Sequence, residues 1–359
     1  MKIGILGSRG IPNAYGGFEQ FAEYLSIGLV ERGMEVWVYC SHTHPYRLPE
    51  YRGVHLIHCK DPEELMGTAG QFLYDLHCIL DSRKRGFDVI LQLGYTSSSI
   101  WHRLLPRKAC IITNMDGLEW KRSKYSPGVR RFLRYAEKLA VKSSDRLVAD
   151  SEAIAEYLSG TYGVASTFIP YGADIPEMPS AEGLRDWGIE SGRYYLLIAR
   201  MQPDNHVEEV ICGVLGSGTP YPLLVVGNTG NRYAHYLQQK YPDPRIRFTG
   251  GIYDPDVLNV LRAHCLLYFH GHSAGGTNPS LLEAMAASAP VCAHDNPFNR
   301  SVLGEDALWF TDAEDISRCI QDLPAEMWWK SAISNNINKI NTKYTWNGVI
   351  DKYRDLFLG

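Results

Sequence analysis

One stretch of the chain places a charged side chain among apolar ones. Residues 277–291 read TNPSLLEAMAASAPV, and Glu283 is surrounded there by leucine, alanine and methionine. A helix that is apolar on nearly every side is buried, and a buried carboxylate needs a partner that offsets its lost hydration. That partner is either a bound ligand, such as the hydroxyls of a ribose, or the protein itself, through a buried arginine or backbone amides. The sequence leaves both alternatives open.

The residues before Glu283 predict an anion site at the start of the same helix. Asn278 is a good N-cap, and Pro279 suits the first helical position. Gly275 and Gly276 would let the backbone approach a ligand closely. We expect free amides at this helix start to attract a phosphate. Glu283 follows about 7 Å along the helix axis, a spacing that suits a nucleotide's diphosphate and its ribose.

A glycine-rich stretch near the N-terminus is a second candidate anion site. Residues 5–25 read ILGSRGIPNAYGGFEQFAEYL, in which a strand ends in a turn and Gly16 and Gly17 open an amphipathic helix. We expect Arg9 to contact an anion there; the alternative is a set of tight turns without a ligand. The earlier glycines are spaced G-x-x-G-x-x-G, and no clear acidic residue ends the second strand. This pattern differs from the dinucleotide fingerprint and argues against a dehydrogenase.

Two further candidates follow predicted strands. In IARMQPDNHVEE, Arg200 comes after an apolar run, where a guanidinium can bind a phosphate, and Asn205 precedes the next helix. The alternative for Arg200 is a surface salt bridge. In NMDGLEWKRSKY, Asp116 could act on a substrate hydroxyl as a base or an orienting acceptor, although an aspartate before Gly117 is also typical of a turn.

The net charge is only −4, yet one segment is strongly basic. Between residues 121 and 142, only Glu137 opposes a series of cations, which are Lys121, Arg122, Lys124, Arg130, Arg131, Arg134, Lys138 and Lys142. Aromatic residues lie among them, a combination that suits an anionic membrane surface. A solvated helix face is the alternative, and no nucleic-acid recognition module accompanies the segment.

Histidines and cysteines do not predict a metal site. His264, His270 and His272 lack convincing ligand spacing, and His294 is isolated in the sequence. The eight cysteines are scattered without a Cys-x-x-Cys pair, which suggests reduced, structural thiols in a cytoplasmic protein. No stretch resembles a signal peptide or a membrane-spanning segment.

A chain of 359 residues is too long for one hydrophobic core, so two domains are expected. Short apolar runs alternate with amphipathic stretches, which predicts an α/β fold with parallel sheets and crossover helices. The predicted strands are 2–6, 35–39, 55–58, 89–93, 109–113 and 146–149, then 194–198, 223–226, 247–249, 265–269 and 290–293. The predicted helices include 18–31, 129–142, 233–240, 254–264 and 279–287. Residues 169–183, IPYGADIPEMPSAEG, indicate a linker.

Together these segments resemble the glycosyltransferases of family 4. The strings GSRGIPNAYGGFE, NMDGLEWKR and HGHSAGGTNPSLLEAM are similar to a bacterial rhamnosyltransferase-type branch of that family, which builds capsule, lipopolysaccharide and cell-wall polysaccharides. The resemblance implies the GT-B fold, two doubly wound Rossmann-like domains facing a central cleft. It implies an acceptor-side domain at 1–170, a hinge at 171–190, a donor-binding domain at 191–343, and a helix at 344–359 that returns to the first domain.

The resemblance also implies roles for the candidate residues. Glu283 would hold the donor ribose, Arg200 the diphosphate, and Asp116 would face the acceptor or the donor sugar. The family's second acid and its lysine are replaced here by Gly275 and Asn205. Neutralising the leaving diphosphate would then rest on a smaller set of groups, namely Arg200, Arg9 and the amides of Thr277 and Asn278.

The resulting prediction is a retaining, metal-independent glycosyltransferase without a cofactor, whose co-substrate is a nucleoside diphosphate sugar. Rhamnose from dTDP-rhamnose is the first expectation for the donor, and a UDP-linked hexose is the alternative. The acceptor would be a saccharide or a lipid-linked saccharide, and the protein would be cytoplasmic and peripheral at the inner face of the membrane. A nucleotide-sugar epimerase of the same fold and a nonenzymatic sugar-binding protein are the rival hypotheses.

Overall fold

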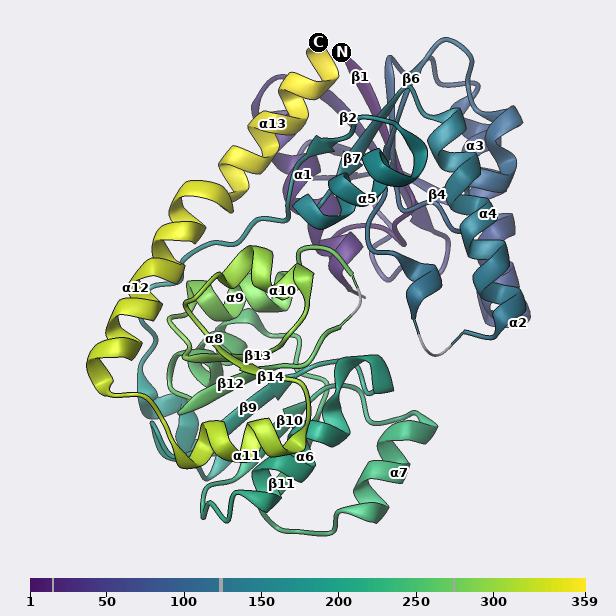
Figure 1. Ribbon diagram of the computed structural model, residues 1–359. Coiled ribbons are helices and arrows are strands. Elements are labelled where there is room, and N and C mark those ends of the chain that lie inside the picture. The colour runs from purple at the N-terminus through teal and green to yellow at the C-terminus, as the bar shows by residue number, and fades with distance from the viewer. Residues whose placement is uncertain (15, 123–124, 274) are drawn as a thin grey trace. The chain divides into compact units, whose positions relative to one another are not determined.

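The computed structural model describes residues 1–14, 16–122, 125–273 and 275–359 (Figure 1). These residues form two compact units. The first unit comprises residues 1–121, 125–172 and 346–359, and the second comprises Arg122 and residues 173–345. Each unit contains its own sheet.

In the first unit, the described residues form a sheet whose strands are parallel except at one edge. The strands lie in the order β3 (Glu50–Tyr51), β4 (Val54–Cys59), β2 (Glu35–Ser41), β1 (Lys2–Leu6), β5 (Val89–Leu93), β6 (Cys110–Asn114), β7 (Arg146–Ala149) and β8 (Thr167–Phe168), and only β3 and β4 pair in antiparallel fashion. β5 is buried at every position. Such apolar central strands are typical of a parallel sheet covered by helices on both faces.

The helices of the first unit include one from the end of the chain. They are α1 (Gly17–Glu31), α2 (Glu63–Met66), α3 (Thr68–Ser82), α4 (Pro127–Ser143), α5 (Glu152–Tyr162) and α13 (Trp346–Leu358), with short 3-10 helices η1 (Ser99–Leu104) and η2 (Glu119–Lys121). α13 lies along α1 (Figure 1), and Gly28 makes this approach close: a Cβ there would lie 2.3 Å from Cδ1 of Ile350. Arg32 donates to Asp351 at 2.7 Å beside the same contact.

The sheet of the second unit is parallel throughout its described length. Its order is β11 (Ile246–Gly250), β10 (Leu223–Val226), β9 (Tyr195–Ile198), β12 (Leu267–His270), β13 (Val291–His294) and β14 (Leu308–Phe310). Its helices are α6 (Val207–Gly216), α7 (Arg232–Lys240), α8 (Pro255–Ala263), α9 (Pro279–Ala286), α10 (Pro297–Leu303), α11 (Ala313–Gln321) and α12 (Glu326–Lys343), with η3 (Ala181–Trp187) and η4 (Pro203–Asn205). The strand order reverses direction between β9 and β12, and ligands of such sheets bind beyond the carboxyl ends at that switch point.

The predicted α/β class, with two Rossmann-like domains, is confirmed. β1, β5, β7 and β10 have the predicted bounds, whereas the short strands β3, β8 and β14 were not predicted. The stretch predicted as a linker runs into η3, in which Leu184 is buried. All eight cysteines are free thiols. Among the described residues, no helix combines the length and the apolar character needed to cross a membrane.

Candidate functional site

The carboxyl edge of the second sheet collects several polar side chains at its switch point. Arg200 follows β9 by two residues and is exposed, and no side-chain hydrogen bond or ion pair holds it within the described part of the chain. Asn205 is buried, and its Nδ2 donates to the carbonyl oxygen of Arg200 at 2.7 Å. Asn205 thus fixes the backbone that carries Arg200, and its amide nitrogen is engaged with the protein. The guanidinium of Arg200 remains available to a ligand.

Four histidines gather at this edge from neighbouring elements. His206 is the N-cap of α6 and stacks on His294 at the end of β13, with ring centroids 4.1 Å apart. His270 ends β12 and stacks on His272, with centroids 4.6 Å apart. The interpretation of His294 as isolated is therefore wrong, because adjacent parallel strands bring their carboxyl ends together. No group of metal-ligating side chains suited to hold an ion occurs among the described residues.

Burial lowers the pKa of three histidines of this cluster, His270, His272 and His294. His270 is 0% exposed, and burial, followed by the charges of His272 and His294, lowers its pKa well below the ordinary value. Burial lowers the pKa of His272 to about 3, with further contributions from Arg200, Arg122 and His206. Burial and the charge of His206 lower the pKa of His294 to about 4.

These shifts predict that the second unit loses stability in mild acid. In the unfolded chain His270, His272 and His294 titrate near pH 6.5, so below that pH the unfolded state binds more protons than the folded state. The free energy of unfolding therefore falls as pH decreases from about 6.5 towards 4, by up to about 1.4 kcal/mol per pH unit for each histidine. Urea unfolding followed at several pH values measures this slope.

A pair of matched variants distinguishes the contribution of the histidines to this pH dependence from that of acidic groups. Asp75, in the first unit, has the opposite effect, because burial raises its pKa to about 6. The His294→Asn variant should show a shallower slope than the wild type, whereas exposed His235→Asn should leave it unchanged. Equal slopes for wild type and His294→Asn would contradict the prediction.

The start of α9 differs from its predicted form. Asn278 caps the helix as predicted, but its Oδ1 accepts the N–H of Ser280 at 3.0 Å, and its carbonyl oxygen accepts the N–H of Leu281 at 3.0 Å. Pro279 has no N–H. The expectation of free amides is therefore wrong for the first three helical residues, because the cap and the proline use these positions. Anion binding would instead depend on the preceding backbone of Thr277 and Asn278 and on the helix dipole.

Gly275 and Gly276 precede this start in the same loop. Gly275 has φ +133°, a conformation that side chains disfavour, and a Cβ there would meet no atom within 4 Å. Backbone conformation, and not crowding, is therefore the reason for glycine at this position. An uncrowded glycine leaves space for a ligand to approach the backbone closely.

Glu283 has a partner within the protein. Its Oε2 forms an ion pair with Nη2 of Arg262 from α8, and Arg262 also contacts Asn259 at 3.5 Å. The side chain of Arg262 is 3% exposed and that of Glu283 26% exposed. Glu283 is thus half-buried, not fully buried as expected, and Arg262 offsets its charge. The pair orients the carboxylate without excluding a role in ribose binding.

A double-mutant cycle separates the structural role of Glu283 from its role in binding. Glu283→Leu leaves buried Arg262 uncompensated and should lower the free energy of unfolding by about 1–3 kcal/mol, less than for a fully buried pair. Replacing both residues, Arg262→Met with Glu283→Leu, should restore most of that stability. Denaturant unfolding measures stability, and calorimetry measures nucleotide binding. If the stabilised double variant binds a donor like the wild type, Glu283 has no ribose contact.

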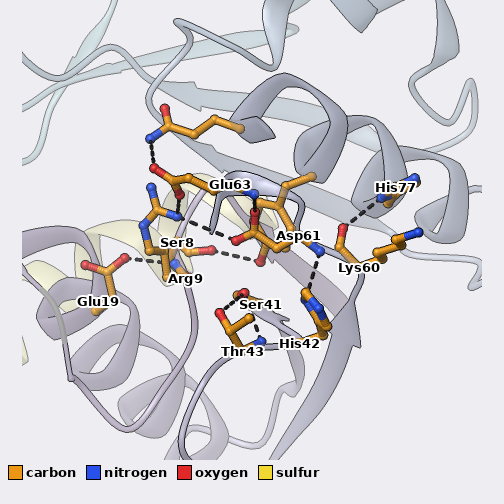
Figure 2. Close-up of polar contacts among 12 residues, drawn as sticks. Ser8, Arg9, Glu19, Ser41, His42, Thr43, Lys60, Asp61, Glu63 and His77 are labelled. Atoms are coloured by element: carbon orange, nitrogen blue, oxygen red, sulfur yellow. Dashed lines mark hydrogen bonds and ion pairs between the residues drawn. The ribbon is translucent and has the colours of Figure 1, made fainter. Parts of the chain in front are cut away.

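In the first unit, Arg9 lies among acids. Its Nη1 pairs with Glu63 and lies 3.6 Å from Oδ2 of Asp61. Figure 2 shows the three side chains together. Gln71 donates to the other oxygen of Glu63 at 2.9 Å. Arg9 follows β1, Asp61 and Glu63 follow β4, and these three residues line a cavity of about 270 Å³ together with Thr43 and Glu64. The predicted anion contact of Arg9 would therefore have to compete with two carboxylates.

In the neighbouring glycine-rich loop, a carboxylate of the protein accepts a hydrogen bond from the backbone. Gly16 precedes α1 and Gly17 begins it. Glu19, in the first turn, is buried, and its Oε1 accepts the backbone N–H of Arg9 at 2.8 Å. An acid at this place stabilises the helix start through the dipole. One amide of the predicted phosphate cradle is thus occupied by Glu19.

Asp116 lies two residues beyond β6 in a left-handed conformation, with φ +47°. Its backbone N–H donates to Oδ1 of Asn114 at 3.0 Å. Aspartate tolerates this conformation better than most residues, so the geometry agrees with a turn. The same geometry places the side chain at the carboxyl edge of the first sheet, where a substrate-contacting group belongs.

A protein-family model matches most of the second unit. Residues 199–325 match the family model described as Glycosyl transferases group 1. The second unit is a glycosyltransferase group 1 domain. Residues 1–174 match a model described as a domain of unknown function. A search of curated proteins finds no match to this chain.

Solved structures show the fold over almost the whole chain. Sucrose-phosphate synthase from Thermosynechococcus elongatus has a TM-score of 0.83 at 19% identity, covering 99% of each chain. Anabaena HepE in complex with UDP and glucose has a TM-score of 0.77 at 17% identity, again covering 99% of each chain. The UDP-forming trehalose-phosphate synthase from Burkholderia xenovorans has a TM-score of 0.75 at 11% identity, covering 100% of each chain. The fold is GT-B.

The basic segment of the first unit forms α4 and the short η2 before it. Arg131, Arg134, Lys138 and Lys142 are exposed along α4, together with Tyr135. Arg130 is half-buried, Lys121 is exposed in η2, and Arg122 belongs to the second unit. Lys124 lies outside the described residues. The guanidinium of Arg134 lies 3.9 Å from the ring centroid of Trp120.

Glu137 does not lie on this basic face. It is 0% exposed, and four donors surround its carboxylate. Tyr157 and Tyr162 donate to Oε1 at 2.8 and 2.7 Å, while Tyr95 and Trp120 donate to Oε2 at 3.2 and 3.1 Å. The acid expected to oppose the basic series is therefore internal, and the exposed face of α4 carries cations without an acid of its own helix.

Proposed function

We propose that the protein is a retaining glycosyltransferase of family 4, of the rhamnosyltransferase-type branch. It moves a sugar from a nucleoside diphosphate sugar to a saccharide or lipid-linked acceptor during assembly of bacterial surface polysaccharide. One observation carries the proposal: the glycosyltransferase domain presents Arg200, unpaired by any described acid, at the switch point of its sheet. The proposed donor is dTDP-rhamnose, with a UDP-linked hexose as the alternative.

Similar structures support a nucleotide-sugar donor. HepE is described in complex with UDP-glucose as well as with UDP, and the trehalose-phosphate synthase is described with glucose-6-phosphate. These ligands belong to those proteins. For this chain they support a diphosphate beside Arg200 and the loop before α9, with the ribose at Glu283.

The proposed mechanism relies on electrostatic stabilisation. The acceptor hydroxyl attacks the anomeric carbon from the face that the diphosphate leaves, through an oxocarbenium-like transition state. The glycosidic bond to the diphosphate breaks as the new one forms, and the hydroxyl proton passes to the leaving phosphate. Arg200 stabilises the charge that develops on the diphosphate. Asp116 orients the acceptor hydroxyl.

Two assays test this function. A melting-temperature screen against dTDP- and UDP-sugars identifies the donor, because a ligand that binds only the folded state raises the melting temperature. Transfer of label from that donor to a lipid-linked saccharide then tests catalysis. Sugar conversion without an acceptor would instead establish an epimerase, and donor binding without transfer or conversion would establish a sugar-binding protein.

We also propose that transfer needs no metal and no cofactor. The sequence has no Asp-x-Asp motif where a donor-bound metal would be expected. Activity should therefore persist in excess chelator. Loss of activity in chelator, with rescue by magnesium, would contradict this part of the proposal while leaving the transfer itself established.

The exposed cations of α4 support a peripheral location at the inner face of the cytoplasmic membrane. Neutralising Arg131, Arg134 and Lys138 with glutamine should weaken binding to anionic vesicles about 100-fold, since each cation near such a surface contributes about 1 kcal/mol. Vesicle co-sedimentation measures the change. The matched control replaces exposed Arg83, Lys84 and Arg107 of the same unit with glutamine. Equal loss in both variants would indicate only a net-charge effect.

A further inference from the structure

His272 is held in a fixed position at the switch-point edge. It follows β12 by two residues, and the loop after it leads into α9. From the α10 side, Nδ2 of Asn296 and Nδ2 of Asn299 donate to the carbonyl oxygen of His272 at 3.2 and 3.1 Å. Asn299 is itself buried. The fold therefore fixes the backbone that carries this imidazole, and the ring stacks on His270.

The imidazole of His272 has an unmet hydrogen-bonding group. Its Nδ1 is buried and forms no hydrogen bond within the described part of the chain. The ring stacks on His270, both of whose nitrogens are likewise buried without a partner among the described residues. A buried polar atom without a partner costs free energy, and such an atom in a native structure calls for an explanation. A bound ligand would supply the missing partner.

The charges around His272 are mainly positive. Arg200 lies after β9, Arg122 belongs to the second unit, and His206 is the N-cap of α6. The charges of all three disfavour the protonated form of the His272 imidazole. Two acids lie on the neighbouring elements. Asp204 of η4 accepts from Ser273 through its carbonyl oxygen, and Glu209 of α6 lies 3.3 Å from His206.

We propose that His272 takes up a proton from solvent when a nucleoside diphosphate sugar binds at this edge, so that an imidazolium beside Arg200 faces the diphosphate. The inference rests on the proposed donor site. Burial, together with the nearby cations, otherwise keeps this imidazole neutral. A bound diphosphate brings two negative charges to this place, and an opposite charge within a few ångströms favours the charged form. The Nδ1–H then donates a charge-assisted hydrogen bond to a phosphate oxygen.

Proton uptake predicts a pH dependence of donor affinity. Since the bound state carries the additional proton, affinity decreases as pH rises through the pKa of His272 in the complex, by about tenfold per pH unit for one linked proton. Uptake of about half a proton on average between pH 6 and pH 8 corresponds to affinity about tenfold higher at pH 6 than at pH 8.

Calorimetry with a nucleotide sugar tests the inference. The probes are dTDP-rhamnose and UDP-glucose, without acceptor, because their phosphates are diesters and lack the second phosphate pKa near 6 that free nucleotides carry. Titrations at pH 6 and pH 8, in two buffers of different ionisation enthalpy, give the affinity and the number of protons taken up. His272→Gln should bind with pH-independent affinity and without proton uptake. His235→Gln, an exposed histidine of α7, should behave like the wild type.

Two outcomes separate this inference from the proposed function. Donor binding with equal affinity at both pH values, or an unchanged pH dependence in His272→Gln, overturns the inference and leaves the donor site intact. Failure of both probes to bind overturns the proposed donor site as well. In the wild type, nitrogen NMR of His272 should change from a neutral to a protonated imidazole on donor addition, a result that does not depend on how the variant folds.

Discussion

Replacing Arg200 with alanine is expected to lower turnover about 100- to 1,000-fold, the range found when one charge-stabilising donor is removed from an active site. Arg200 is exposed at the switch-point edge, and no acid of the described chain neutralises it. Its interaction with the diphosphate strengthens as the glycosidic bond breaks, because negative charge accumulates on the leaving group. The loss should therefore appear mainly in kcat, with a smaller change in donor affinity.

Steady-state kinetics and calorimetry together measure this effect. Arg232→Ala is the matched control, since Arg232 is an exposed arginine on α7 of the same unit. Arg200→Lys retains the charge but not the bidentate geometry of the guanidinium, and its activity should lie between those of Arg200→Ala and the wild type. If Arg200→Ala keeps near wild-type turnover, or loses only donor affinity, the assigned role is wrong.

The largest expected effect on stability belongs to Glu137. Glu137→Leu fills a similar volume but removes the acceptor of Tyr95, Trp120, Tyr157 and Tyr162. Each buried donor left without a partner costs about 1–3 kcal/mol, and some of the four regain water. We expect the free energy of unfolding of the first unit to fall by about 3–5 kcal/mol, as for the loss of one member of a buried charged network.

Denaturant unfolding of Glu137→Leu measures the change, with Trp120 fluorescence as a local probe. Glu156→Leu, an exposed glutamate of α5, is the control and should have little effect. In Glu137→Gln the amide oxygen still accepts from two of the four donors, but the amide NH₂ group faces the other two. We therefore expect an intermediate loss in the free energy of unfolding. A loss below about 1 kcal/mol for Glu137→Leu would mean that the donors find other partners.

Much of the fold followed from the sequence because apolar periodicity is local. The bounds of β1, β5, β7 and β10 were predicted correctly, since each is an apolar run followed by a turn or a polar residue. β3 and β8 contain two residues each, too few for any pattern to be recognised. Their pairing depends on a neighbouring strand that the sequence alone does not place.

The positions of some candidate residues in the fold were predicted, for the same physical reason. Arg200, Asn278 and Asp116 follow strand ends or precede a helix, positions that sequence can identify. The partner of Glu283 could not be identified, because Arg262 belongs to a different helix and the contact depends on how α8 and α9 pack. The histidine cluster was missed although a signal existed: His270 and His294 each end an apolar run, and parallel strands place such ends side by side.

The way the chain is divided between its two units has a consequence for engineering. All but one of the described residues of the second unit come from a single uninterrupted stretch, 173–345, whereas the first unit is assembled from segments on both sides of it. In the gene, the coding region of the second unit therefore interrupts that of the first unit, between Gly172 and Trp346. A stop codon after residue 345 would thus leave the second unit complete and remove α13 from the first unit.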